Sequence, residues 1–551
     1  MYANTAVKYP YAIPRMHYRN IPHPHMENAL KESGLLDHNK HILQCKTEAG
    51  HETVLRRIQA VQTDRRTLVG RSAHLDRLQR ACSANPNAVA DAAALLDSAA
   101  AAEKILAQID ISGEASDLEK EATAQIYFNG TFTTPLNSIP YIVAIIAALK
   151  IYVAPLLALC LPLIIFILPY VFMTTMMGTA IPWDTYKTIL FRFVLGIDTS
   201  EPWSLKQVMK FVWGLASFGQ GILQPVFTAF HTWKLRRTFM EQAEAIRTYT
   251  GAAVGLHKIM TSLVPCRTPY MPPVPADSYV AVHWWGREKS VVEHYRSLIG
   301  WTDMMFALGA ARETWRPVAF VSASVSGSEG ASVSTGTLHL EGFHDVSIPA
   351  DRAVRNDIVI EGHTLITGPN RGGKSSVMRG ILQAVLCAQT FGAVPNARSA
   401  TMSTPYSAFY TRLVSADRPG SASLFESDVM FALDVLRGTG AGTSTSASPF
   451  IMIDELFHST NPSDAERSAS YFLRQLWASS GATSLISTHM FGLLTTAPDH
   501  VARKCVYATQ APDGSIDYTY SVRDGVCTVS SVGEVWESFI VKYKSSAFST
   551  A

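Results

Sequence analysis

The sequence predicts an α + α/β fold: a helical region interrupted by a transmembrane hairpin, followed by an α/β domain with a mostly parallel sheet. Three observations lead to this prediction. Apolar residues recur at helical spacing as far as about Gln125, and charged residues then nearly vanish between Ile139 and Met177. From Leu338 onward, short apolar strands alternate with helices. A chain of 551 residues is long enough for several domains, each with its own core.

The same changes in residue composition and spacing divide the chain into four regions. Residues 1–130 form a helical N-terminal region and residues 131–233 form the apolar hairpin. Residues 234–321 form a second helical region and residues 338–543 the α/β domain. In the first region, apolar side chains spaced three and seven positions apart share one helix face. These side chains are Leu55, Ile58, Val61, Leu68, Leu75 and Leu78.

Charge and cysteine content exclude some classes of protein. The formal net charge is +2 and 17% of residues are charged, so we do not expect strong non-specific binding of nucleic acid. The seven cysteines are scattered and form no C-x-x-C pair, which favours buried thiols in a reducing compartment over a metal site or a disulfide framework. Because the first twenty residues contain no apolar core, we expect no cleavable secretory signal.

Two apolar segments make up the predicted hairpin. Ile151–Met173 is uncharged and long enough to cross a hydrocarbon core of ~30 Å at ~1.5 Å per residue. Its three prolines are better tolerated in a membrane helix than in a soluble one. Phe211–Phe230 is uncharged but contains glutamines and glycines, so it either spans the membrane or lies as an interfacial or buried helix. The basic cluster Lys234–Arg237 would hold its end in the cytosol. We therefore expect a membrane protein with its α/β domain on the cytosolic side and membrane lipid as a partner.

A glycine-rich motif carries the strongest chemical signal. The pattern G-x-x-x-x-G-K-S runs from Gly368 to Ser375, after the apolar strand Thr364–Thr367 and before the helix Val377–Gln389. Glycines let backbone N–H groups surround a β-phosphate, and the helix N-terminus adds its positive end. Lys374 would bridge the β- and γ-phosphates of ATP, and the Ser375 hydroxyl would bind Mg²⁺. The motif predicts an ABC-like P-loop NTPase whose nucleotide-binding residues are Gly368, Pro369, Asn370, Gly372, Gly373, Lys374, Ser375 and Ser376.

Two later strands end in candidate catalytic residues. The apolar run Phe450–Ile453 is followed by Asp454, which would hold Mg²⁺, and by Glu455, which would act as a general base toward the attacking water. A third strand ends in His489, which would sense the γ-phosphate through a hydrogen bond. Because ligands bind at the carboxyl ends of strands in α/β sheets, we expect these side chains to meet.

In their order, spacing and residue identities, these motifs resemble those of the ATPase of the MutS family of DNA mismatch-repair proteins. The likeness includes Thr460 and Asn461, the Ser-Thr-His ending at His489, and Val354–Asp357. It covers the region from Leu338 to Tyr543 and extends more weakly to the helical regions, which are similar to the family's core and lever helices. It implies Mg²⁺-dependent ATP hydrolysis and a homodimer, or a dimer with a related subunit, formed through the ATPase domain.

The resemblance also implies a contact made in trans. Ser421–Asp428 is similar to the family segment that reaches the partner subunit's nucleotide. On this likeness Ser423 contacts the opposing γ-phosphate and Asp428 replaces an expected glutamate.

Departures from the family leave the function open between three alternatives. No phenylalanine precedes Phe128, so the mismatch-reading domain with its Phe-x-Glu wedge has no counterpart there. The apolar hairpin occupies the place of the DNA clamp. The chain is then a membrane-tethered DNA-handling ATPase, with DNA as a partner, or a membrane motor that no longer recognises mismatches. The third alternative is a scaffold switched by ATP binding with little turnover, against which the intact Glu455 argues.

Overall fold

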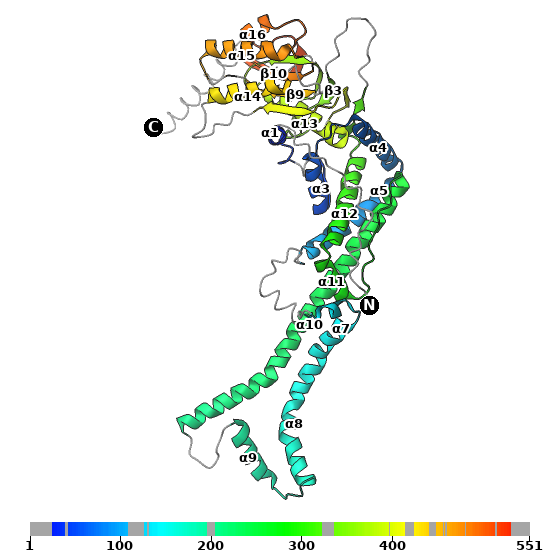
Figure 1. Ribbon diagram of the computed structural model, residues 1–551, viewed down its shortest axis with the longest axis vertical. Coiled ribbons are helices and arrows are strands. Elements are labelled where there is room, and N and C mark those ends of the chain that lie inside the picture. The colour runs from blue at the N-terminus through cyan, green and yellow to red at the C-terminus, as the bar shows by residue number, and fades with distance from the viewer. Residues whose placement is uncertain are drawn as a thin grey trace. The chain divides into compact units, whose positions relative to one another are not determined.

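The computed structural model divides the chain into two units, each described here by itself (Figure 1). The first unit comprises Met1–Leu96, Leu256–Pro269 and Ser297–Ala551, and the second comprises Asp97–Gly255 and Tyr270–Arg296. The structure describes residues 25–38, 42–107, 109, 126–128, 132–195, 204–321, 336–395, 397–413, 424–439, 448–455, 457, 460–479, 481–512 and 515–530.

Helices of the first unit begin at residues that satisfy their free N–H groups. Asp64 precedes α4 and its carboxylate accepts hydrogen bonds from the N–H groups of Arg66 and Thr67. Thr47 precedes α3 and accepts from the N–H of Gly50 at 2.9 Å. The helices wholly within this unit are α1 (Met26–Ser33), α3 (Glu48–Ile58), α4 (Arg65–Ala84), α13 (Lys374–Phe391), α14 (Leu424–Thr439), α15 (Pro462–Trp477) and α16 (Phe491–Thr496). Three more, α5 (Pro86–Leu106), α10 (Leu205–Leu263) and α12 (Lys289–Ala310), contribute residues to both units.

A six-stranded sheet in the order β12-β11-β5-β10-β9-β8 forms the centre of the first unit. Its neighbouring strands are parallel except for β12, which pairs antiparallel with β11. The strands are β5 (His363–Thr367), β8 (Ala408–Arg412), β9 (Pro449–Ile453), β10 (Thr483–Ser487), β11 (Ala502–Gln510) and β12 (Ile516–Asp524). A four-stranded sheet contains β2 (Ala319–Phe320), β7 (Ser399–Met402), β3 (Thr337–Phe343) and β4 (Asn356–Glu361), and a two-stranded sheet contains β1 (Trp315–Pro317) and β6 (Ala393–Pro395).

Both faces of the six-stranded sheet are covered by helices. Successive side chains of a strand point to opposite faces. Leu365 and Ile451 accordingly pack in the cluster formed with α14, α15 and α16, whereas Ile366 and Met452 pack in the cluster that contains α13. Figure 1 shows α13 and α15 on different sides of β9 and β10. Burial on both faces explains why these strands are continuous apolar runs without alternation.

The prediction of a fold that mixes helices with a mostly parallel sheet is confirmed. The predicted strand Thr364–Thr367 lies in β5, and the predicted helix Val377–Gln389 lies in α13. The sequence also predicts loops at the Ser/Gly-rich stretches Ser322–Gly336 and Gly438–Pro449, of which residues 322–335 and 440–447 lie outside the described residues.

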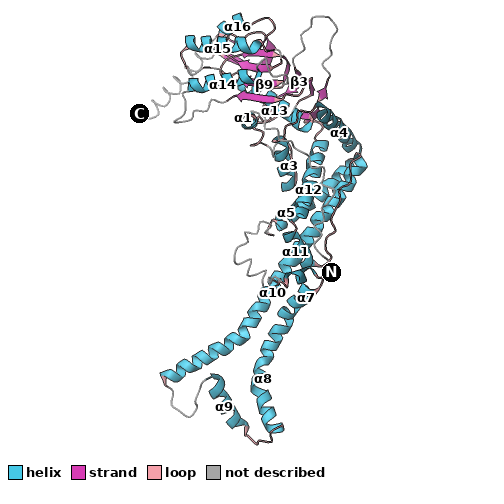
Figure 2. Ribbon diagram, in the orientation of Figure 1, coloured by secondary structure: helices cyan, strands magenta, loops and turns pink. Residues whose placement is uncertain are grey.

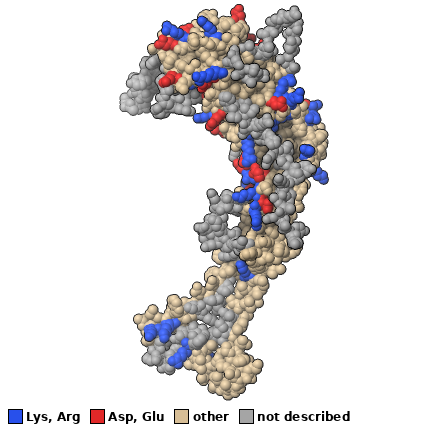
Figure 3. Space-filling view, in the orientation of Figure 1, with Lys and Arg blue, Asp and Glu red and all other residues tan. Residues whose placement is uncertain are grey.

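The described elements of the second unit are helices (Figure 2). Besides parts of α5, α10 and α12, they are η1 (Thr134–Ser138), α7 (Ile142–Ala148), the π-helical turn η2 (Leu149–Val153), α8 (Ala154–Thr175), α9 (Trp183–Leu195) and α11 (Ser278–Arg287). The sequence of α8 contains no Asp, Glu, Lys or Arg, and no blue or red lies over this helix on the face seen in Figure 3. Large apolar side chains of α8 and α10 are exposed, among them Leu156, Leu168, Phe172, Trp213, Phe227 and Phe230.

The predicted membrane localisation, with the ATPase on the cytosolic side, is wrong. Within the part of the chain that the structure describes, no helix combines the length and the apolar character needed to cross a membrane. The segment Phe211–Phe230 belongs to α10, a single helix of 59 residues that also carries charged side chains. The other predicted span, Ile151–Met173, is divided between η2 and α8. The predicted transmembrane hairpin and lipid partner lose their basis with this finding.

A buried carboxylate joins two helices of the first unit and leads to a stability prediction. Asp303 of α12 accepts hydrogen bonds from the N–H and hydroxyl of Thr47, at 2.8 and 2.7 Å, and from the N–H of Lys46 at 3.0 Å. Asp303→Ala leaves these donors buried without an acceptor, so we expect the free energy of unfolding to fall by about 3 kcal/mol. Urea unfolding of the full chain measures this. Asp91→Ala, on the exposed face of α5, is the control and should change it by less than about 0.5 kcal/mol.

Candidate active site

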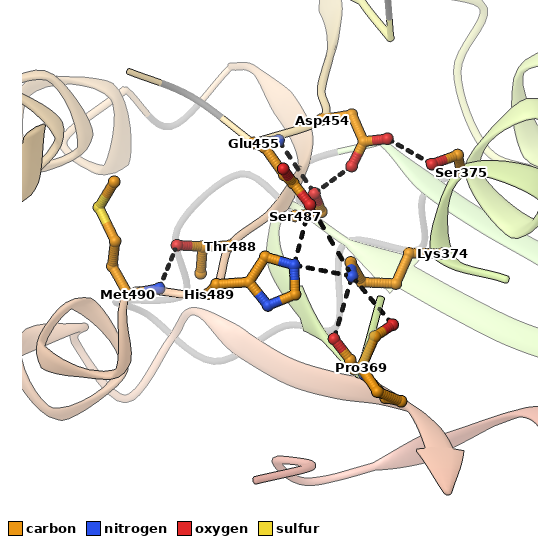
Figure 4. A network of polar contacts seen from close by, with 10 residues as sticks. Pro369, Lys374, Ser375, Asp454, Glu455, Ser487, Thr488, His489 and Met490 are labelled. Carbon is orange, nitrogen blue, oxygen red and sulfur yellow. Dashed lines mark hydrogen bonds and ion pairs between the residues drawn. The ribbon is translucent and has the colours of Figure 1, made fainter. Parts of the chain in front are cut away.

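The predicted site residues follow three neighbouring parallel strands of the six-stranded sheet. In the order β5-β10-β9, the three strands end at Thr367, Ser487 and Ile453. The glycine-rich loop follows β5, Asp454 and Glu455 follow β9, and His489 lies two residues beyond β10. Since parallel strands end at one edge of the sheet, these segments converge there (Figure 4).

The loop between β5 and α13 needs glycine at two positions. Gly373 has a φ of +95° and Gly368 a φ of +155°, values that residues with a side chain rarely adopt. A Cβ on Gly368 would also lie 2.9 Å from the carbonyl oxygen of Val506, and one on Gly373 would lie 3.1 Å from a ring carbon of Tyr520. The loop therefore stays free of side chains where it meets the N-terminus of α13.

Lys374, the first residue of α13, is buried with only 5% of its side chain exposed. Its ammonium donates to the carbonyl oxygens of Gly368 at 3.0 Å and Pro369 at 3.3 Å. Burial lowers the pKa of Lys374, and the nearby carboxylates of Glu455 and Asp454 partly oppose this effect. A buried cation held by neutral carbonyls is well suited to meet an incoming anion.

Asp454 lies among hydroxyl groups and a backbone carbonyl. Ser375 Oγ donates to Asp454 Oδ2 at 2.6 Å, and Ser487 Oγ donates to Asp454 Oδ1. The N–H of Asp454 donates to the carbonyl oxygen of Arg412 at 2.8 Å. A serine hydroxyl beside a carboxylate is a set of hard oxygen donors, the kind that Mg²⁺ prefers.

Glu455 turns toward the loop and contacts His489. Its φ of +54° is uncommon for a residue with a side chain, and its N–H donates to Ser487 Oγ at 3.0 Å. Its Oε1 lies 2.8 Å from His489 Nε2 and 4.0 Å from the Lys374 ammonium. With 40% of its side chain exposed, Glu455 is within reach of water.

One nitrogen of His489 has two partners with opposite requirements. Nε2 lies 3.0 Å from the Lys374 ammonium and 2.8 Å from Glu455 Oε1. A protonated Nε2 donates to the carboxylate, whereas an unprotonated Nε2 accepts from the ammonium. His489 Nε2 therefore forms a hydrogen bond with only one of these groups at a time.

Comparison with known proteins shows which family the site region resembles. The family model described as MutS domain V matches residues 364–538, which include the loop and all three strand ends. Over these residues the chain is similar to the MutS family.

Curated MutS relatives match the same part of the chain. The DNA mismatch repair protein MutS of Shouchella clausii is 30% identical over 176 residues, which are 31% of this chain and 19% of the relative. MutS of Streptococcus sanguinis is 29% identical over 181 residues, 32% of this chain and 20% of the relative. MutS of Lactococcus lactis subsp. lactis is 30% identical over 182 residues, 32% of this chain and 21% of the relative. The chain thus spans about a fifth of the length of these relatives.

Within the MutS domain V, the structure brings together most of the residues that the motifs single out. Gly368, Pro369 and Lys374 meet His489 and Glu455 in one network of polar contacts (Figure 4). Ser375 and Asp454 pair beside them, as described above. Asn370 is exposed on the loop, Gly372 closes a turn to the Pro369 carbonyl at 3.1 Å, and Ser376 lies in the first turn of α13.

The predicted trans segment of the MutS domain V is only partly described. Ser423 lies outside the described residues. Asp428 is buried in α14 and forms an ion pair with Arg412 at 2.6 Å. Its carboxylate thus has a partner inside its own subunit.

Three residues near the site were missed by the sequence analysis as functional positions. They are Arg412, which contacts Asp454, Tyr520, whose ring approaches Gly373, and Asn356, which binds the main chain of β12 at Tyr520 and Val522. Tyr520 and Arg412 belong to no motif. The Asn-Asp pair at Asn356 was seen as part of the family likeness, but its contact with β12 depends on a strand more than 150 residues further along the chain.

Proposed function

We propose that this chain binds ATP at a P-loop in its domain V and hydrolyses it with Mg²⁺. The observation that carries the proposal is the buried Lys374 ammonium, which shares one strand-end network with a carboxylate–hydroxyl pair and an exposed carboxylate. Within this network the ammonium suits a phosphate, the carboxylate–hydroxyl pair suits a divalent cation, and the exposed carboxylate suits a water molecule.

The loop and Lys374 would hold the phosphates. Gly368 and Gly373 leave the backbone N–H groups accessible, and α13 directs its N-terminal N–H groups and positive dipole end to the same place. The Lys374 ammonium would exchange its bonds with the two loop carbonyls for stronger, charge-assisted bonds to phosphate oxygens.

Ser375 and Asp454 would hold Mg²⁺. Their oxygens already lie 2.6 Å apart, and Ser487 fixes the second oxygen of the Asp454 carboxylate. When bound, the cation neutralises the charge of the phosphate oxygens. Asp454 is held by Ser487 and by the carbonyl of Arg412, so the cation would meet a carboxylate that is already oriented.

Glu455 would orient the water that attacks the γ-phosphate and accept its proton. It is the exposed carboxylate of the network, and its main chain is anchored to Ser487 Oγ. Release of Glu455 from His489 would free its Oε1 for this water, while His489 turns to the phosphate.

We propose a DNA mismatch-repair type of role, with a dimer formed through domain V. The support is the match to MutS domain V and the likeness to DNA mismatch repair proteins. A second candidate is an ATP-driven machine that does not recognise mismatches. The charge-free surface of α8 favours it, because binding to a phosphate backbone depends on Lys and Arg side chains.

Hydrolysis by the purified full chain tests the proposal. We expect ATP turnover in Mg²⁺, loss of turnover in EDTA, and recovery when Mg²⁺ is restored, because without the cation the Asp454 carboxylate would face the negative phosphates directly and the charge of their oxygens would not be neutralised. Matched and mismatched duplex DNA are then added at physiological salt. Stimulation by the mismatch favours the repair role, and equal rates with all additions favour the second candidate. Turnover no higher than that of a Lys374→Ala preparation would overturn the ATPase itself.

A further inference from the structure

Arg412, the last residue of β8, lies directly beside the residues that follow β9. β8 and β9 are parallel, and Arg412 is opposite Ile453. Its carbonyl oxygen accepts the N–H of Asp454 at 2.8 Å. The position of the Asp454 main chain, and of Glu455 next to it, therefore depends on where Arg412 lies.

The side chain of Arg412 is bound to the first turns of α14. Its Nη2 lies 2.6 Å from Asp428 Oδ1, and its Nη1 donates to the carbonyl oxygen of Ser427 at 3.2 Å. The guanidinium carbon also lies 5.6 Å from the centre of the Phe431 ring, over its face. Only 16% of the Arg412 side chain and 4% of the Asp428 side chain are exposed, so solvent weakens this pairing little.

These contacts link the start of α14 to the residues that follow β9. The planar guanidinium binds two successive residues of α14, Ser427 and Asp428, which ties its orientation to that of the helix. Its main chain binds Asp454. A shift of the first turns of α14 would act on the Arg412 side chain, and the Arg412 main chain is bound to Asp454.

We propose that Arg412 is a positioning residue that couples the start of α14 to Asp454 and Glu455. The inference rests on the proposed ATPase function and deepens it. The described part of Ser421–Asp428, the segment expected to meet the partner's nucleotide, is the beginning of α14. Arg412 would thus report the state of the partner's site to the carboxylates of its own subunit.

Arg412→Lys in the full chain is the main test. Lysine keeps the positive charge but cannot bind Asp428 and the Ser427 carbonyl with one planar group. We expect kcat to fall roughly ten- to hundred-fold, as for a misplaced catalytic group. KM and the affinity for a non-hydrolysable ATP analogue should stay within about two-fold of the parental values, because Arg412 contacts no residue of the phosphate loop in the described contacts.

Two further variants separate positioning from simple anchoring of the helix. Arg437→Lys changes an exposed arginine of the same helix that pairs with Asp434 at 3.2 Å, and it should leave kcat unchanged. The double variant Arg412→Gln with Asp428→Asn removes both charges and so leaves no buried charge unpaired. If it melts within a few degrees of the parental protein, we expect its kcat to be as low as that of Arg412→Lys.

The outcomes are distinct. An unchanged kcat in folded Arg412→Lys protein overturns the inference alone. A loss of kcat matched by an equal loss of nucleotide affinity or of folded protein shows that Arg412 only anchors α14, and this too overturns it. Absence of ATP turnover in the parental chain overturns the proposed function and the inference with it.

Discussion

Glu455→Gln is expected to bind ATP normally and to hydrolyse it about 10²–10⁴-fold more slowly than the parental chain, the usual effect of removing a general base. Glutamine keeps the size of the side chain and its contact with His489, but it cannot accept a proton from water. The phosphate-binding groups, Lys374 and the loop, are untouched by the change. Single-turnover hydrolysis and equilibrium binding of a fluorescent ATP analogue measure the two quantities separately.

Glu361→Gln is the matched control for this variant. Glu361 is an exposed carboxylate at the end of β4, and it contacts none of the network residues in the contacts described. Its substitution should change neither binding nor turnover. Hydrolysis by Glu455→Gln at the parental rate would show that another group orients the water.

Lys374→Ala is the complementary change and should abolish nucleotide binding. The substitution removes the buried cation and leaves the carbonyls of Gly368 and Pro369 facing the phosphates. Lys258→Ala, an exposed lysine of α10 in the same unit, is the control for loss of one positive charge. Retention of nucleotide affinity in Lys374→Ala would contradict the assignment of the loop.

Mg²⁺ and ATP are expected to drive the chain into a dimer, and this is the second large effect. If each nucleotide also contacts the partner's Ser421–Asp428 segment, ATP binds the dimer more tightly than the monomer, and linkage then favours the dimer. We expect the dimer dissociation constant to fall at least about ten-fold in ATP, an effect of roughly 1.4 kcal/mol. Sedimentation velocity of the full chain, with ATP, ADP and no nucleotide, measures it.

Two variants sharpen the dimer experiment. Glu455→Gln should accumulate as dimer in ATP because the nucleotide that stabilises the interface is not consumed. Ser423→Ala should lower turnover without weakening ATP binding by the monomer, since its expected contact is with the partner's phosphate. A sedimentation coefficient of the monomer at high protein concentration in ATP, for both parental and Glu455→Gln chains, would count decisively against a nucleotide-driven dimer.

Sequence reasoning located the centre of the candidate site because its residues lie in or next to local motifs. Gly368 and Lys374 belong to one short pattern, and Asp454 and His489 each follow an apolar strand. Buried parallel strands place their carboxyl ends at one edge, so the residues after them converge even though more than 100 positions separate Lys374 from His489. Order along the chain and strand periodicity were enough for this inference.

The contacts around these central residues could not be predicted from the sequence in this way. Arg412 belongs to no motif, and its pairing with Asp428 depends on how α14 packs beside β8. Tyr520 reaches Gly373 only because β12 adds to the sheet antiparallel to β11. The expectation that Asp428 replaces a glutamate of the trans segment came from a likeness of sequence, whereas its burial and its ion pair with Arg412 are properties of the packed chain.

The apolar region shows most clearly the difference between what the sequence predicts and what the tertiary structure decides. Composition alone identifies a nearly uncharged stretch, and periodicity alone cannot tell which environment such a stretch occupies. The membrane prediction was made because the stretch is long enough to cross a bilayer. In the structure the first predicted span lies in η2 and α8, and the second is a segment of the 59-residue α10. No described helix is both long and apolar enough to cross a membrane.

The sequence by itself determined that the fold mixes helices and sheet, which strands lead to the candidate site, and which groups meet there. These properties follow from short-range rules: residue spacing, glycine at positions of positive φ, and polar residues at strand ends. The tertiary structure alone decided which groups hold those residues in place, as Arg412 does between Asp454 and α14. The reason is that hydrogen bonds and ion pairs act over a few ångströms in space, and residues far apart along the chain become neighbours only once the helices and sheets have packed.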